Sequence, residues 1–237
     1  MRSGQMGEME GSIDLYWLPL GAGGHSVRLN GRVYEAVVSR LERRHACDLY
    51  HSALEVRVPE GRFVIEQAPL GADPATTRGV VAQGQVGARS AGRFRLFRYE
   101  VRRWRNGSIP DVSEAVESPQ RVSDDGRQAR RLLDIVPCVP TPVWGRDELD
   151  AGEMWNSNSV ISWLLACSGL PTDTIRPPQN GRAPGWDAGL VVARREQLLR
   201  GTAAEAELAP TASAASVDNE NVAVRLALHG AADAVAE

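Results

Sequence analysis

Three polar side chains in two separate segments have the types needed for acyl-transfer chemistry. His51 lies in L-Y-H-S-A-L-E-V, a run of strand-forming residues, and Glu66 ends the apolar run F-V-I-E that follows it. Ser157 stands in N-S-N-S, directly before an apolar stretch. A histidine that takes the proton of a hydroxyl, with a carboxylate orienting the imidazole, is the set used by serine hydrolases. The pattern makes Ser157 the candidate nucleophile, His51 the candidate base and Glu66 the orienting group.

The same residues also have ordinary structural explanations. Serine and asparagine lead the preference for helix N-caps, so N-S-N-S is also what the start of a helix requires. A histidine at the edge of a strand is more often a hydrogen-bonded structural residue than a base. If the site is catalytic, Asn156 and Asn158 flank the helix N-terminus whose backbone N–H groups would stabilise an oxyanion. The sequence leaves both readings open.

Two segments resemble a known family. H-S-A-L-E-V, a turn and then V-I-E is similar to the hairpin of the lecithin:retinol acyltransferase-like family, a circularly permuted branch of the NlpC-like papain superfamily. The segment N-S-N-S-V-I-S-W-L-L is similar to that family's N-C-E-H-F-V helix start. The resemblance implies a papain-like α+β fold with an antiparallel sheet packed against a nucleophile-bearing helix. It also implies that His51 is the base and that Ser157 replaces the family's catalytic cysteine.

The elements expected around these residues follow from periodicity and turn signals. Strands are predicted at 13–18, 49–58, 62–67 and 94–103, the last with a bulge at Leu96 and Phe97, with a further strand near 80–82. Helices are predicted at 31–44, 125–136, 156–168 and 187–200. Residues 1–11 are expected to be a disordered leader, 12–200 one domain, and 201–237 an alanine-rich, disordered tail.

Composition excludes few functional classes, but it weakens the case for nucleic-acid binding. The net charge is −3, of which the tail from residue 201 contributes −5 and the remainder +2, so long-range attraction to nucleic acid is not expected. The arginines and aromatic residues between 93 and 105 fit a strand with its aromatics inward and its arginines in water. The segment lacks the strongly basic surroundings of nucleic-acid binders.

Metal, disulfide and membrane signals are weak. Three widely spaced cysteines form no C-x-x-C pair. His45, Cys47 and His51 lack a fourth ligand for zinc, so no metal and no cofactor are expected. There is no signal-peptide pattern and no run of 18 apolar residues, which predicts a cytoplasmic protein without an integral membrane segment.

Two functions are therefore carried forward. The first is a hydrolase or acyltransferase that attacks an amide, ester or thioester bond of a small-molecule, lipid or peptide substrate through Ser157. The second is a catalytically inactive binding module on the same fold, in which residues 156–159 only cap a helix. A nucleic-acid-associated protein is a distant third, and the sequence does not identify the substrate.

Overall fold

The computed structural model describes residues 10–20, 47–70 and 78–208, with side chains through residue 202. The predicted helix at 31–44, most of the predicted leader and most of the predicted tail lie outside the described residues. The chain divides into two units between Glu196 and Gln197, and the fold below is that of the first unit. No helix in the described ranges is both long and apolar enough to cross a bilayer.

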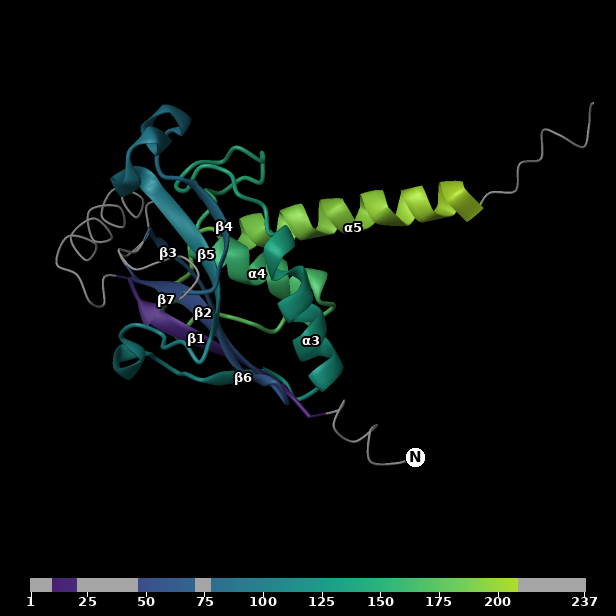
Figure 1. Ribbon diagram of the computed structural model, residues 1–237, viewed down its shortest axis with the longest axis horizontal. Coiled ribbons are helices and arrows are strands. Elements are labelled where there is room, and N and C mark those ends of the chain that lie inside the picture. The colour runs from purple at the N-terminus through teal and green to yellow at the C-terminus, as the bar shows by residue number, and fades with distance from the viewer. Residues whose placement is uncertain (1–9, 21–46, 71–77, 209–237) are drawn as a thin grey trace, which may run out of the picture. The chain divides into compact units, whose positions relative to one another are not determined.

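A mixed α+β fold is built on one largely antiparallel sheet with few helices (Figure 1). The strands follow the order β4-β5-β3-β2-β1-β6, with β7 paired in parallel to one end of β2. Their bounds are β1 (Ser12–Pro19), β2 (Asp48–Val58), β3 (Gly61–Pro69), β4 (Val80–Gln85), β5 (Arg98–Arg105), β6 (Gln120–Ser123) and β7 (Gly181–Arg182). The α+β class and the antiparallel sheet predicted from the sequence are confirmed.

Three α-helices and four short 3-10 turns complete the described fold. The helices are α3 (Gly126–Ile135), α4 (Ser157–Cys167) and α5 (Trp186–Leu208). The 3-10 turns are η1 (Arg89–Arg93), η2 (Arg95–Phe97), η3 (Val112–Glu114) and η4 (Val136–Cys138). The predicted helices at 125–136 and 156–168 are confirmed to within a residue or so, and the helix predicted at 187–200 is part of α5.

Alternation along the strands gives the sheet two chemically different faces. In β2, Tyr50, Leu54 and Val56 belong to the main hydrophobic core, whereas Ala53 packs in a second, smaller cluster with Leu18. Successive side chains of a strand point to opposite faces, so the even-numbered residues of β2 face the main core and the odd-numbered ones face away from it. β1 pairs with β2 over its whole length without a break in register, which keeps this alternation intact through residue 51.

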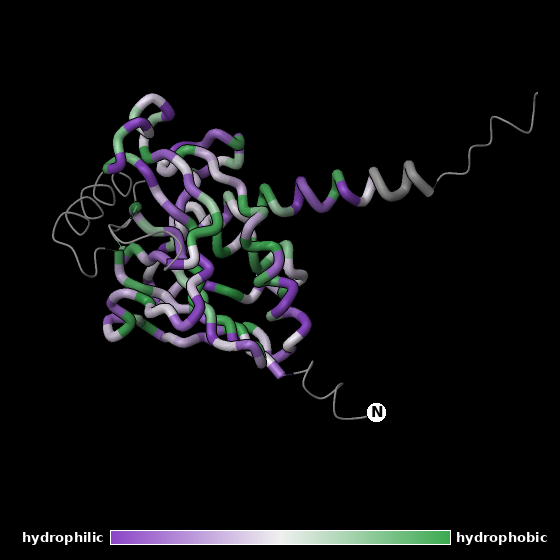
Figure 2. The backbone as a smooth tube through the Cα atoms, in the orientation of Figure 1, coloured by the Kyte–Doolittle hydropathy of each residue, from purple (hydrophilic) through white to green (hydrophobic). Residues whose placement is uncertain are grey.

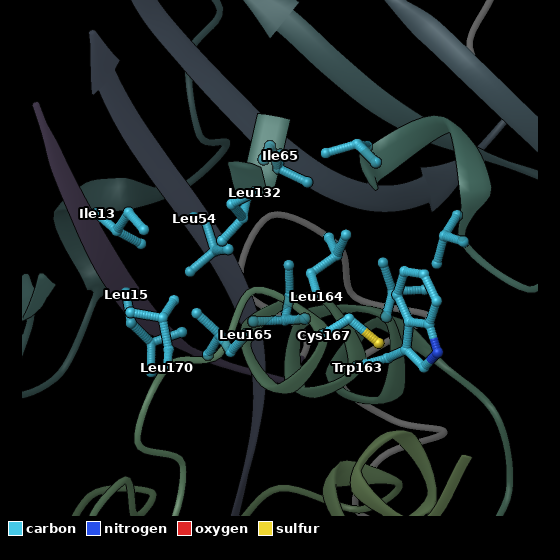
Figure 3. Close-up of a cluster of buried hydrophobic side chains, with 14 of the residues drawn as sticks. Ile13, Leu15, Leu54, Ile65, Leu132, Trp163, Leu164, Leu165, Cys167 and Leu170 are labelled. Carbon is cyan, nitrogen blue, oxygen red and sulfur yellow. The ribbon is translucent and has the colours of Figure 1, made fainter. Parts of the chain in front are cut away.

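Helices α3 and α4 cover the face of the sheet that carries the main core. Leu132 of α3 and Leu164 and Leu165 of α4 meet Leu54 and Ile65 of the sheet there (Figure 3). Nearly every residue of α4 is buried, and Figure 2 shows that the helix is hydrophobic along most of its length. A helix that is buried on nearly every side is enclosed by protein. Its N-terminus is therefore held in place by contacts on several sides.

One predicted strand is placed differently. Residues 94–97, expected in a bulged strand with inward aromatics, form η2 and the link that joins it to η1, and β5 begins only at Arg98. Phe94 and Phe97 are exposed rather than inward, because the period-2 alternation does not apply to 3-10 turns. Arg102, expected in water, is buried. The irregular register lies in β4, between Val80 and Ala82.

Candidate functional site

Asn156 caps α4 as its position in N-S-N-S suggests. Its side-chain oxygen accepts hydrogen bonds from the backbone N–H groups of Asn158 (2.8 Å) and Ser159 (3.4 Å). In return, the Ser159 hydroxyl accepts one from the Asn156 N–H at 3.0 Å, which completes a capping box. The Asn156 amide nitrogen donates to the carbonyl of Pro184 at 2.8 Å. The side chain of Asn156 is thus engaged at both ends in structural bonds.

Asn158 joins α4 to the sheet. Its amide nitrogen donates to the carbonyls of Tyr50 and Pro184, both at 2.9 Å, and its side-chain oxygen accepts from the Ser52 hydroxyl at 2.8 Å. The Leu49 carbonyl accepts from Leu20 on the β1 side, so the Tyr50 carbonyl points to the opposite edge of β2.

Among the described residues, that edge of β2 has no strand partner between β3 and β7. β3 pairs with β2 only from Leu54 to Val58, and β7 pairs with it only at Asp48 and Leu49. Asn158 therefore fills a gap in the hydrogen-bonding of the β2 edge. A buried backbone carbonyl needs such a partner, so this asparagine has a structural duty that the sequence alone did not reveal.

The first two turns of α4 are also fixed to the start of α5. The hydroxyls of Ser159 and Ser162 donate to the carbonyls of Gly185 and Trp186, each at 2.7 Å. A Cβ atom on Gly189 would lie 2.1 Å from the Ser159 carbonyl oxygen and 2.1 Å from the Ser162 hydroxyl. Glycine at 189 therefore permits the close approach of the two helices.

Ser157 differs from its neighbours in the motif. It is the first residue of α4 and is buried. Asn156, Asn158 and Ser159 all make side-chain hydrogen bonds, but within the described chain none is found for the Ser157 hydroxyl. Its position at the helix N-terminus is the one predicted for a nucleophile, and its hydroxyl is the one that the local structure does not use.

His51 projects from the other face of the sheet. Ser52 contacts α4 through Asn158, and the adjacent His51 must point the opposite way, on the side of Leu18 and Ala53. Both Ser157 and His51 are described, and no hydrogen bond joins them. The structure thus does not bring the predicted base to the predicted nucleophile.

The surroundings of His51 favour a neutral imidazole. Burial lowers the pKa of His51 from 6.5 to about 4, and the negative charge of Asp111 offsets this only in part. Transferring the charged imidazolium out of water costs more free energy than its attraction to the single carboxylate of Asp111 recovers. His51 is therefore uncharged at neutral pH.

Glu66 belongs to a buried ionic network, not to His51. Its carboxylate accepts from Arg102 at 2.7 Å, and Arg102 also donates to Glu100 at 2.6 Å. Arg78 makes a two-pronged contact with Glu100, with both distances 2.7 Å. Burial raises the pKa of Glu66 despite its arginine partner, whereas the hydrogen bonds from Arg78 and Arg102 outweigh burial and lower the pKa of Glu100. The orienting role predicted for Glu66 has no contact to support it, because its partner is Arg102.

Gln67 is a polar residue of interest that the sequence reasoning missed. It is 5% exposed, and neither its side-chain oxygen nor its nitrogen has a hydrogen-bond partner among the residues that the structure describes. Unsatisfied buried amides are rare in folded proteins. Gln67 lies two residues after Ile65 in β3, so its side chain projects from the same face of the sheet, the one that α4 covers. Its position after Glu66 in the alternating F-V-I-E-Q was the available signal.

A pocket of about 460 Å³ opens beside the start of α5. Arg176, Arg182 and Arg194 line it, together with apolar side chains that include Ile175 and Trp186. Asp173 and Asp187 line it as well, and Arg194 lies 4.0 Å from the Asp173 carboxylate. Glu153 also lines it and accepts from the Gly185 N–H at 2.8 Å, and burial raises its pKa. No carboxylate among the described residues pairs with Arg176, whose guanidinium donates to the Ile175 carbonyl at 2.8 Å.

Metal-binding side chains are not gathered in the part of the chain that the structure describes, where no group of three or more could hold an ion. His45, one of the three ligands weighed from the sequence, lies outside the described residues. Comparison of the chain with known protein families, with characterised proteins and with solved structures finds no match.

Proposed function

We propose that this domain is a non-catalytic ligand-binding module on a circularly permuted papain-like fold. Support for that fold comes from chain order, because the hairpin of β2 and β3 precedes α4, and the N-terminus of α4 contacts β2 through Asn158. The observation that carries the binding function is the direction of His51, which leaves Ser157 without a histidine base among the described residues. Serine is protonated at neutral pH and needs a general base in the attacking step.

The ligand site we propose is the pocket beside α5. Arg176 suits an anionic group, since no carboxylate among the described residues pairs with it and guanidinium forms strong charge-assisted hydrogen bonds with carboxylates and phosphates. Ile175, Trp186 and Leu190 provide an apolar wall beside them. A small molecule or peptide end that combines an acidic group with an apolar part fits this lining.

Binding can be tested by titrating phenyl phosphate and benzoate while following backbone amide resonances. We expect shifts confined to the pocket segments at 172–194, and affinity roughly tenfold weaker in Arg176→Gln, the loss of one charge-assisted hydrogen bond. Arg127→Gln is the matched control, because Arg127 lies on α3 with an 81% exposed side chain. Shifts that are equal in both variants, or absent altogether, would refute the ligand site.

The second candidate function is acyl transfer through Ser157. Two observations favour it: the hydroxyl of Ser157 is not used by the fold, and the nearby face of the sheet carries the unsatisfied amide of Gln67. A serine-directed fluorophosphonate separates the two functions. A binding module gives no labelling that disappears in Ser157→Ala, whereas labelling of the intact protein that is lost in this variant supports the enzyme.

A further inference from the structure

The connection between β4 and β5 exposes a cluster of large apolar side chains. Phe94 is 53% exposed, Leu96 83% and Phe97 42%. The other exposed large hydrophobic residues of the described chain are Val112, Leu198 and Leu199, well away in sequence. Single exposed apolar residues are common on protein surfaces, but three within four residues form a patch that needs an explanation.

This segment is a convex tip, which we define as residues 93–98. It consists of the last residue of η1, Phe94, the whole of η2 and the first residue of β5, and neither 3-10 turn has a buried residue. In Figure 1 the two turns extend beyond the ends of β4 and β5 at the top of the view.

Positive charge surrounds the apolar side chains of the tip. The sequence from 86 to 99 contains Arg89, Arg93, Arg95 and Arg98 and no acidic residue. Arg89 is paired with Glu148 at 2.9 Å. Arg93 lies 4.7 Å from the centre of the Phe94 ring, and Arg98 donates to the neutral amide of Gln83 at 2.7 Å. Within the described chain, no carboxylate neutralises Arg93 or Arg98.

We propose that this tip docks on the surface of an anionic lipid bilayer. Phe94, Leu96 and Phe97 would enter the boundary between headgroups and acyl chains, while Arg93 and Arg98 contact lipid phosphates. Apolar burial combined with attraction of arginine to anionic lipid is the physical basis of peripheral membrane binding. Nucleic acid fits less well, because Leu96, the most exposed of the three, cannot stack on a base.

The proposal is tested by co-sedimentation of the full chain with vesicles of phosphatidylcholine alone and of phosphatidylcholine with phosphatidylglycerol. We expect binding to the anionic vesicles only, weakened by added salt. Leu96→Ser should reduce the partition coefficient roughly tenfold through lost apolar burial. Arg93→Gln and Arg98→Gln should each reduce it roughly fivefold.

Val112→Ser is the matched control, since Val112 is exposed but lies outside the tip. It should bind anionic vesicles like the parent chain, and all variants should keep the parent's unfolding midpoint. The proposal is overturned by an absence of vesicle binding, by binding that survives Leu96→Ser, or by equal binding to neutral vesicles. Release from vesicles by a single-stranded oligonucleotide at equal phosphate concentration would also overturn it, in favour of nucleic acid.

Discussion

Lowering the pH from 7.5 to 5 should destabilise the folded domain by about 2 kcal/mol through His51 alone. The pKa of His51 is lowered from 6.5 to about 4 in the folded state, mainly by burial. Between these two values, the unfolded chain takes up a proton that the folded chain does not. The contribution of His51 to stability is therefore fully present above about pH 6.5 and falls as the pH drops. It is lost below about pH 4, where the total loss amounts to about 3 kcal/mol.

Urea unfolding followed by tryptophan fluorescence at pH 7.5, 6, 5 and 4.5 measures this effect. Other groups also titrate in this range. The decisive quantity is therefore the difference in unfolding free energy between the parent and His51→Gln, because the glutamine side chain does not titrate. That difference should change by about 2 kcal/mol between pH 7.5 and 5, because only the parent carries the penalty of charging His51. The unfolding free energy of the parent should fall relative to that of His51→Gln as the pH is lowered.

A direct titration of the His51 ring by NMR provides the independent check. Asp111→Asn is the matched variant, because the charge of Asp111 raises the His51 pKa and its removal should lower that pKa further. A measured pKa near 6.5 would refute the burial argument. So would a pH profile that is the same for the parent and His51→Gln.

Two further variants test the structural roles assigned to site residues, both by urea unfolding at pH 7.5. Asn158→Ala should cost about 2 to 4 kcal/mol, since it leaves the Tyr50 carbonyl and other buried polar groups without a partner; a cost below about 0.5 kcal/mol would contradict the bridging role. Glu100→Gln should cost about 3 to 5 kcal/mol, since it removes the charge that both Arg78 and Arg102 contact. Arg89→Gln, at an exposed ion pair, is the control and should leave stability unchanged, and an equal loss in all three variants would show that the burial of the network is not what matters.

The elements around the site were predictable because local signals agree with each other. Two runs of strand-forming residues flank Pro59, Glu60 and Gly61, and they form the hairpin of β2 and β3. The capping residue Asn156 and the stop at Gly169 bound α4 closely. Such signals depend on neighbours in the chain, which is why the sequence alone was enough.

The direction of His51 needed tertiary information, although part of the signal was present. In β2 the even positions read Tyr50, Ser52, Leu54 and Val56, and the odd positions include His51 and charged residues. This alternation favours the even face for a buried helix. The resemblance to the permuted papain-like hairpin suggested His51 as a base, but it did not show which face of the strand α4 would cover.

The charged residues on the face of the sheet away from the main core could not be assigned partners from sequence, because their contacts join distant strands. Glu66 meets Arg102 across β3 and β5, and Arg78 reaches Glu100 from the chain before β4. Removing one member leaves an uncompensated buried charge, so such a network disfavours any alternative register of these strands.

The polar residues that the sequence offered as a catalytic set are, in this fold, divided between two structural tasks. Asn158 completes the edge of β2 on one side of the sheet, and Glu66 fixes the pairing of β3 and β5 on the other. Within the described residues, neither Ser157 nor His51 makes a side-chain hydrogen bond, and the two project from opposite faces of the sheet. Any chemistry at this helix therefore depends on a base that β2 does not supply.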